Sequence, residues 1–146
     1  MKLTVQVVVK TERPPAAIEK VLLDSEKTAL WTSVLERCEV LTRPPGLVGS
    51  KARLHYRQGG RCYVIEDELL AWEPQRRYLS RVTGDAIAAD VETTLTPTSN
   101  GTRVEVQWHG SGKPILLRLL LPLMRGSIAR QTKEDLLKLK AIVEVE

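Results

Sequence analysis

The sequence predicts an α+β fold in which a curved antiparallel sheet wraps around one long C-terminal helix. Most of the chain before residue 113 alternates apolar and polar side chains over short segments, as strands do. Turn-rich stretches separate these segments, so each strand can pair with the next one as an antiparallel neighbour. The last segment instead repeats its less polar residues every three or four positions, on one helical face. That face carries Ile128, Thr132, Leu136, Leu139 and Val143.

The N-terminal region predicts one strand and two short helices. Residues 2–10 alternate, and the strongly apolar face of this strand carries valines at alternate positions. Pro14 and Pro15 end the strand, and a proline suits the first turn of the helix that we expect over residues 16–23. A second short helix is expected over 26–33, with Leu30 and Trp31 pointing inward. Both helices are too short to be stable alone, so they must pack on the sheet.

Six further strands follow in hairpin succession. We expect them over residues 35–42, 50–57, 61–72, 77–84, 86–96 and 102–109. The connections contain Pro, Gly and Asn, which favour turns. With the first strand this makes about seven strands. No internal repeat or linker interrupts the pattern, so residues 1–146 are expected to form a single domain.

The segment before the amphipathic helix is unusually apolar. Residues 115–124 contain one charged side chain, Arg118, and Pro122 is expected to kink or interrupt the helix. Such a segment is either buried or covers an apolar cavity. We therefore expect a lid formed by Leu116, Leu119, Leu120 and Met124, while residues 128–143 anchor the fold.

Composition narrows the class of protein. The 146 residues are 42% hydrophobic and 27% charged, which is typical of soluble globular proteins. The net charge of +4 comes from basic residues spread among acidic ones, and this pattern argues against a nucleic-acid binder. No apolar run approaches the roughly 20 residues of a membrane span, and no signal-peptide pattern is present, so a cytoplasmic protein is expected. There Cys38 and Cys62 should be reduced and unlinked.

Candidate catalytic groups are few. Asp90 lies in the middle of a predicted strand, where an inward carboxylate would be costly unless it had a function. Glu66 and Glu68 belong to a run of three acids, one or two of which could face inward and act as general acid or base. His55 and His109 share the polar faces of their strands and are expected on the surface. No metal site or cofactor is implied.

The order of these features resembles the START-related SRPBCC superfamily, which includes polyketide cyclase/dehydratase-like proteins and the birch pollen allergen. The resemblance spans the whole chain. In the N-terminal half it rests on Pro14-Pro15 before a short helix, on Trp31, and on Gly46 and Gly49 before a strand. In the C-terminal half it rests on Glu73-Pro74 after a long strand, on Leu95-Thr96-Pro97 before the turn to Gly101-Thr102, and on the closing helix. The resemblance implies a helix-grip fold with a deep apolar cavity between the sheet and the last helix. One departure is the complete lack of Phe, which relatives often place in the cavity.

Relatives of this kind bind lipids, sterols, polyketides or plant hormones, and some catalyse cyclisation or dehydration. Strand alternation and helical spacing predict a set of ligand-contacting residues. These are Trp31, Leu54, Tyr56, Val104, Val106, Trp108, Leu116, Leu119, Leu120, Met124 and Ile128.

Three functions remain open at this point. The first is a carrier or sensor of a hydrophobic small molecule that is lipid-, polyketide- or isoprenoid-like, in a monomer or weak homodimer. The second is a cyclase/dehydratase-type enzyme. The third is a module that docks on a membrane surface or a protein through residues 115–124. The absence of an obvious catalytic set favours the first.

Overall fold

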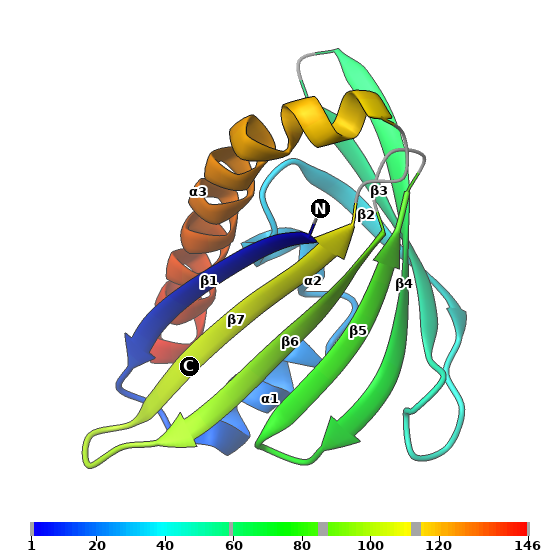
Figure 1. Ribbon diagram of the computed structural model, residues 1–146. Helices are drawn as coiled ribbons and strands as arrows, with labels where there is room; N and C mark the ends of the chain where they lie inside the picture. The colour runs from blue at the N-terminus through cyan, green and yellow to red at the C-terminus, as the bar shows by residue number, and fades with distance from the viewer. Residues whose placement is uncertain (1, 59, 85–87, 112–114, 146) are drawn as a thin grey trace.

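The computed structural model shows a long, strongly curved sheet with all three of the described helices on its concave side (Figure 1). It describes the backbone of residues 2–58, 60–84, 88–111 and 115–145, and the side chains of these ranges except residues 2, 3, 58, 111 and 115–125. The strands are β1 (Lys2–Thr11), β2 (Leu35–Thr42), β3 (Lys51–Gln58), β4 (Arg61–Glu73), β5 (Arg77–Thr83), β6 (Ala88–Pro97) and β7 (Thr102–Ser111). The helices are α1 (Pro15–Leu22), α2 (Thr28–Trp31) and α3 (Ile115–Val145).

The seven strands form one antiparallel sheet in the order β1-β7-β6-β5-β4-β3-β2. Each strand from β2 to β6 pairs with the next strand along the chain, as the short connections predict, and β1 joins the far edge beside β7. Register shifts interrupt the β2–β3 pairing and the β4–β5 pairing. Such bulges increase local twist and bending. The predicted α+β architecture, with its curved sheet and long last helix, is confirmed.

A dry core fills one side of the concave face. The valines of β1 alternate inward, and Val5, Val7 and Val9 are all buried. They meet the inner face of α3, where Leu139 and Val143 are 1% and 0% exposed. The buried residues of α1 join the same cluster. Packing of this face, rather than intrinsic helix propensity, therefore holds the short α1 in place.

The turn between β6 and β7 packs closely against the end of β1. A Cβ atom on Gly101 would overlap the backbone of Thr11 and Glu12, so only glycine fits without movement. Next to it, the Thr102 hydroxyl donates a hydrogen bond of 2.6 Å to the carbonyl of Arg13. The Gly101-Thr102 pair thus fixes the chain where β1 leads to α1.

One detail of the helices differs from the sequence prediction, and another agrees with it. The second helix is a single turn, and Leu30, predicted to point inward, is 63% exposed, so that expectation was wrong. In a one-turn helix, neighbouring residues point in different directions, and the partly buried Trp31 takes the inward position. Helix α3 is continuous through Pro122, but its first turns run in a different direction from the rest (Figure 1). The missing amide of Pro122 bends the helix without ending it.

Candidate ligand cavity

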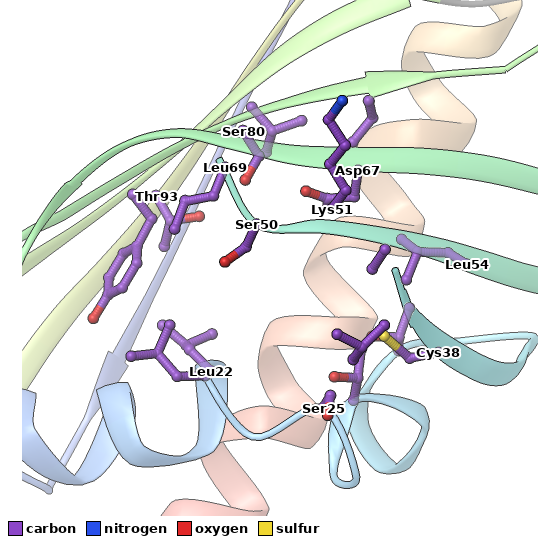
Figure 2. A pocket seen from close by; sticks show the side chains of 18 of the residues that line it. Leu22, Ser25, Cys38, Ser50, Lys51, Leu54, Asp67, Leu69, Ser80 and Thr93 are labelled. Carbon is purple, nitrogen blue, oxygen red and sulfur yellow. The ribbon is translucent and has the colours of Figure 1, made fainter. Parts of the chain in front are cut away.

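A cavity of about 340 Å³ lies between the sheet and the helices. Its wall combines residues of β2 to β7 with α1, α2, α3 and the connections that precede β2 and β3. Figure 2 shows Asp67, Leu69 and Ser80 on the sheet side, with Leu22 and Ser25 facing them from the helical side. The apolar part of the wall includes Leu22, Leu54, Leu69, Val91 and Val106, and its aromatic part consists of Trp31, Tyr56, Tyr78 and Trp108.

The register of the sheet explains why these residues meet. Residues that pair across antiparallel strands share one face of the sheet. Trp108 pairs with Val91, which pairs with Ser80, and all three line the cavity. A second row joins Val106, Thr93 and Tyr78 in the same way. The alternation of three strands, β5, β6 and β7, therefore places their cavity residues together.

The cavity is open because the inward side chains of this region are small. Ala52, Ser80 and Thr93 occupy inward positions where the neighbouring core has Val or Leu. Leu95 and Val104, which pair with each other and are 2% and 1% exposed, lie on the same sheet face but in the packed core. Small side chains opposite a helix leave unfilled volume. This volume falls within the usual range of small-molecule sites.

Asp67 is the acidic group on the sheet side of the cavity. It pairs with Ala52 on one neighbouring strand and Val82 on the other, and all three line the cavity. Burial raises the pKa of its carboxyl from 3.8 to about 6 because the low-polarity surroundings disfavour the charged form. A hydrogen bond with the Ser80 side chain partly offsets this effect on the pKa.

Other ionisable groups on the wall are also shifted towards their neutral forms. Burial, and then the nearby charge of Asp67, raise the pKa of the Cys38 thiol. Burial is also the main cause of the raised pKa of the Tyr56 hydroxyl. On α3, burial raises the pKa of Asp135, although its carboxylate accepts a 2.7 Å hydrogen bond from the Ser33 amide. The wall is thus a weakly polar surface with thiol, hydroxyl and carboxyl groups.

Glu19 of α1 fixes one corner of the cavity. Its Oε2 atom accepts a 2.6 Å hydrogen bond from the Tyr78 hydroxyl and a longer one of 3.4 Å from the Trp72 indole N–H. The same oxygen accepts a hydrogen bond from the Gln75 amide in the β4–β5 turn. One carboxylate therefore ties α1 to that hairpin and holds the Tyr78 ring against the cavity.

The structure places the described members of the predicted contact set in two environments. The cavity wall contains Trp31, Leu54, Tyr56, Val106 and Trp108. Val104 and Ile128 are not part of that wall, because both pack in or against the dry core. The side chains of Leu116, Leu119, Leu120 and Met124 lie outside the described residues, so the lid remains a prediction.

The predicted catalytic acids lie away from the cavity. Asp90 Oδ1 lies 3.1 Å from Arg81 Nε, and Glu66 Oε1 lies 3.7 Å from Arg53 Nε, in exposed ion pairs. Glu68 pairs in register with Arg81, so it shares their face of the sheet. These acids occupy the convex face, on the opposite side of the sheet from Asp67.

Sequence reasoning did not single out Asp67, although a signal for it exists. It alternates with Ile65 and Leu69 along β4, so it belongs to the apolar face of the strand, whereas its two acidic neighbours belong to the other. Both histidines lie, as predicted, on the polar faces of their strands. His55 Nε2 is 3.0 Å from Glu39 Oε1, and His109 is exposed. Within the described part of the chain, no group of three or more metal-ligating side chains comes together.

Comparison with known proteins agrees with this geometry. The family model for polyketide cyclase/dehydrase and lipid transport matches residues 2–144. The chain belongs to this family. A comparison with curated proteins finds no significant match. No helix in the described part of this family member is long and apolar enough to span a membrane.

Solved structures of this family member's fold include proteins with different described roles. A START superfamily protein from Mycobacterium smegmatis has a TM-score of 0.80 and 17% identity, over 97% of both chains. The Zhui aromatase/cyclase from Streptomyces sp. R1128 has a TM-score of 0.80 and 16% identity, over 99% of this chain and 94% of that one. The structure of Ara h 8.0201 has a TM-score of 0.78 and 14% identity, over 100% of both chains. At these identities the likeness establishes the shared fold only.

Proposed function

We propose that this protein binds a hydrophobic small molecule in the internal cavity and acts as its carrier or sensor. The observation that supports this is the cavity of about 340 Å³, lined by leucine, valine and four aromatic side chains. Burial of apolar ligand surface is worth about 25 cal/mol per Å², so a molecule that fills such a space is held without any charged contact. The lipid-transport description of the family supports the same function.

Titration with a neutral apolar fluorophore, N-phenylnaphthylamine, tests this proposal. We expect saturable binding with one fluorophore per chain, displacement by octanol, and quenching of the tryptophans that line the cavity. Mass spectrometry of organic extracts from the purified protein should then identify the natural occupant. A fluorophore signal that never saturates, or that persists unchanged after unfolding in urea, would contradict the proposal.

A second candidate function is dehydration of a β-hydroxyketone, with Asp67 as the general base. Its carboxyl lies on the cavity wall, and its pKa of about 6 suits proton transfer near neutral pH. In this step the Asp67 carboxylate removes the proton α to the carbonyl. The electron pair of the broken C–H bond forms the carbon–carbon double bond, and the β-hydroxyl leaves as water with the proton that Asp67 gives back, which restores the carboxylate.

The aldol of benzaldehyde and acetone tests the enzymatic alternative, because its dehydration product absorbs in the ultraviolet. Turnover that Asp67→Asn abolishes and that Asp90→Asn retains would favour this alternative. If the reaction runs at the same rate with the wild type, with Asp67→Asn and without protein, the enzymatic alternative fails and only the binding function remains.

A further inference from the structure

The charge of Asp67 is not balanced within the cavity. Its pKa is governed by burial and by the Ser80 hydrogen bond, and no positively charged group contributes. The basic residues among those that line the cavity are Arg43 and Lys51, and both are exposed to solvent. The described cavity thus presents a carboxylate on an apolar wall and keeps its own cations at the surface.

The other described groups that line the cavity near Asp67 do not supply a buried positive charge either. From β2 and β3 it is approached by the Cys38 thiol and the Tyr56 hydroxyl, whose raised pKa values keep both neutral at physiological pH. From α3 the cavity receives a second carboxyl, Asp135, whose pKa burial raises, an effect that the Ser33 hydrogen bonds and the nearby Lys138 partly offset. Lys138 is exposed and does not belong to the cavity wall. Among the described residues, the ionisable groups that line this part of the cavity are therefore neutral or acidic, apart from the exposed Lys51.

We propose that the cavity selects apolar ligands that carry a positively charged amino group, and that Asp67 is the residue that determines this selectivity. The inference rests on the proposed binding function and adds the chemical class of the ligand. A poorly solvated carboxylate without a cation is unfavourable, and an ammonium group on the ligand removes that penalty by forming a charge-assisted hydrogen bond.

The same wall disfavours anionic ligands. A fatty-acid carboxylate in the cavity would lie near Asp67 and Asp135 and find no buried cation among the described residues. Like charges at short distance in a poorly solvated space repel strongly. The aromatic rings of Trp31, Tyr56 and Trp108 also line the cavity, and such rings attract cations rather than anions.

Three probes of equal chain length test the proposal by calorimetry at neutral pH: octylamine, octanol and octanoate. The ammonium of octylamine is charged at this pH, as that of lysine is. We expect octylamine to bind the wild type at least about tenfold more tightly than octanoate. Asp67→Asn should weaken the affinity for octylamine about tenfold and change the affinity for octanol by no more than about twofold. The matched control, Asp90→Asn, removes a carboxylate from the convex face and should change none of the affinities.

The wild type supplies an independent readout if the Asp67 variant fails to fold. Lowering the pH from about 7.5 to about 5 protonates Asp67. This change should weaken the affinity for octylamine, while the affinity for octanol stays constant. Binding of octanol with no preference for octylamine over octanoate, or a preference that survives Asp67→Asn, would overturn this inference and leave the proposed function standing. Failure of all three probes to bind would overturn both.

Discussion

The two halves of the concave face have the same alternating pattern but different contents. In the packed half, β1, the end of β6 and the start of β7 meet α1 and the C-terminal part of α3, and residues such as Leu95 and Leu139 are 1–2% exposed. In the hollow half, the inner face of β3, β4 and β5 carries Ala52, Asp67 and Ser80, which border the cavity. Alternation determines which face is inward, whereas the size and polarity of the inward residues determine whether that face is filled.

This difference assigns stability to one half and ligand binding to the other. The packed half removes large apolar side chains from water and so provides most of the folding free energy. The hollow half gives up that packing and buries ionisable groups, which lowers stability until a ligand occupies the space. The following predictions test that division, from the largest effect to the smallest.

Truncation of Leu139 should have the largest effect. Leu139→Ala removes a side chain that is 1% exposed in the packed half and should lower the free energy of unfolding by about 2–5 kcal/mol. The matched change Leu54→Ala in the cavity wall should lower it by only about 1 kcal/mol, because no new enclosed space is formed. Urea unfolding measures both. Equal losses would show that the two halves are packed alike.

Asp67→Asn should stabilise the empty protein at neutral pH. The pKa of Asp67 is raised in the folded state, from 3.8 to about 6, so ionisation destabilises the fold at pH values above this range. Removal of the charge should therefore raise the free energy of unfolding by about 1–3 kcal/mol at pH 7.5.

The stabilisation should vanish as the pH falls from about 6 to about 4, because the wild-type carboxyl is then neutral in both states. Urea unfolding of the two proteins across this pH range isolates the effect, since all other titrating groups are common to both. A variant less stable than the wild type at neutral pH would mean that Asp67 has a favourable partner in the fold.

Glu19→Gln should weaken the link between α1 and the β4–β5 hairpin. The neutral amide oxygen of glutamine is a weaker acceptor than the carboxylate oxygen that accepts from Tyr78, Trp72 and Gln75, so we expect a loss of about 1–2 kcal/mol in unfolding free energy. Thermal unfolding measures the loss, with Glu26→Gln as an exposed control on the same side of the molecule. An unchanged melting temperature would show that this contact is dispensable.

The smallest effect concerns thiol reactivity. Cys62 is exposed, whereas Cys38 lines the cavity and has a raised pKa, so Cys62 should react first with Ellman's reagent. In a Cys62→Ser variant, octanol should slow the reaction of Cys38 severalfold by occupying the cavity. A rate that octanol does not change would place its binding elsewhere.

Much of the fold was predictable because strand alternation, turn residues and helical spacing are local features of the sequence. The same alternation predicted the inward placement of Leu54, Tyr56, Val106 and Trp108. It could not separate Val104 from them, since Val104 has the same parity and differs only in facing the packed core. Whether an inward residue meets another side chain or empty space depends on the opposite layer, which sequence periodicity does not describe.

The cavity carboxyl shows a second limit. Asp67 has the parity of an inward residue, but the run of three acids from Glu66 to Glu68 left open which of its members faces inward. Its burial depends on the register with Ala52 and Val82, which brings two small or apolar neighbours to its sides. Leu30 shows the opposite case, because an apolar residue in a one-turn helix is left exposed.

The central claim, that the hollow half is a ligand site, is tested most directly by filling it. Thr93 lines the cavity, and Thr94 follows it on the convex side of β6. We therefore compare the affinity of N-phenylnaphthylamine for the wild type, Thr93→Phe and Thr94→Phe, each shown to fold by its circular dichroism. The account predicts that Thr93→Phe loses at least about tenfold in affinity through steric exclusion, while Thr94→Phe binds as the wild type does. Unchanged binding by a folded Thr93→Phe protein would contradict it.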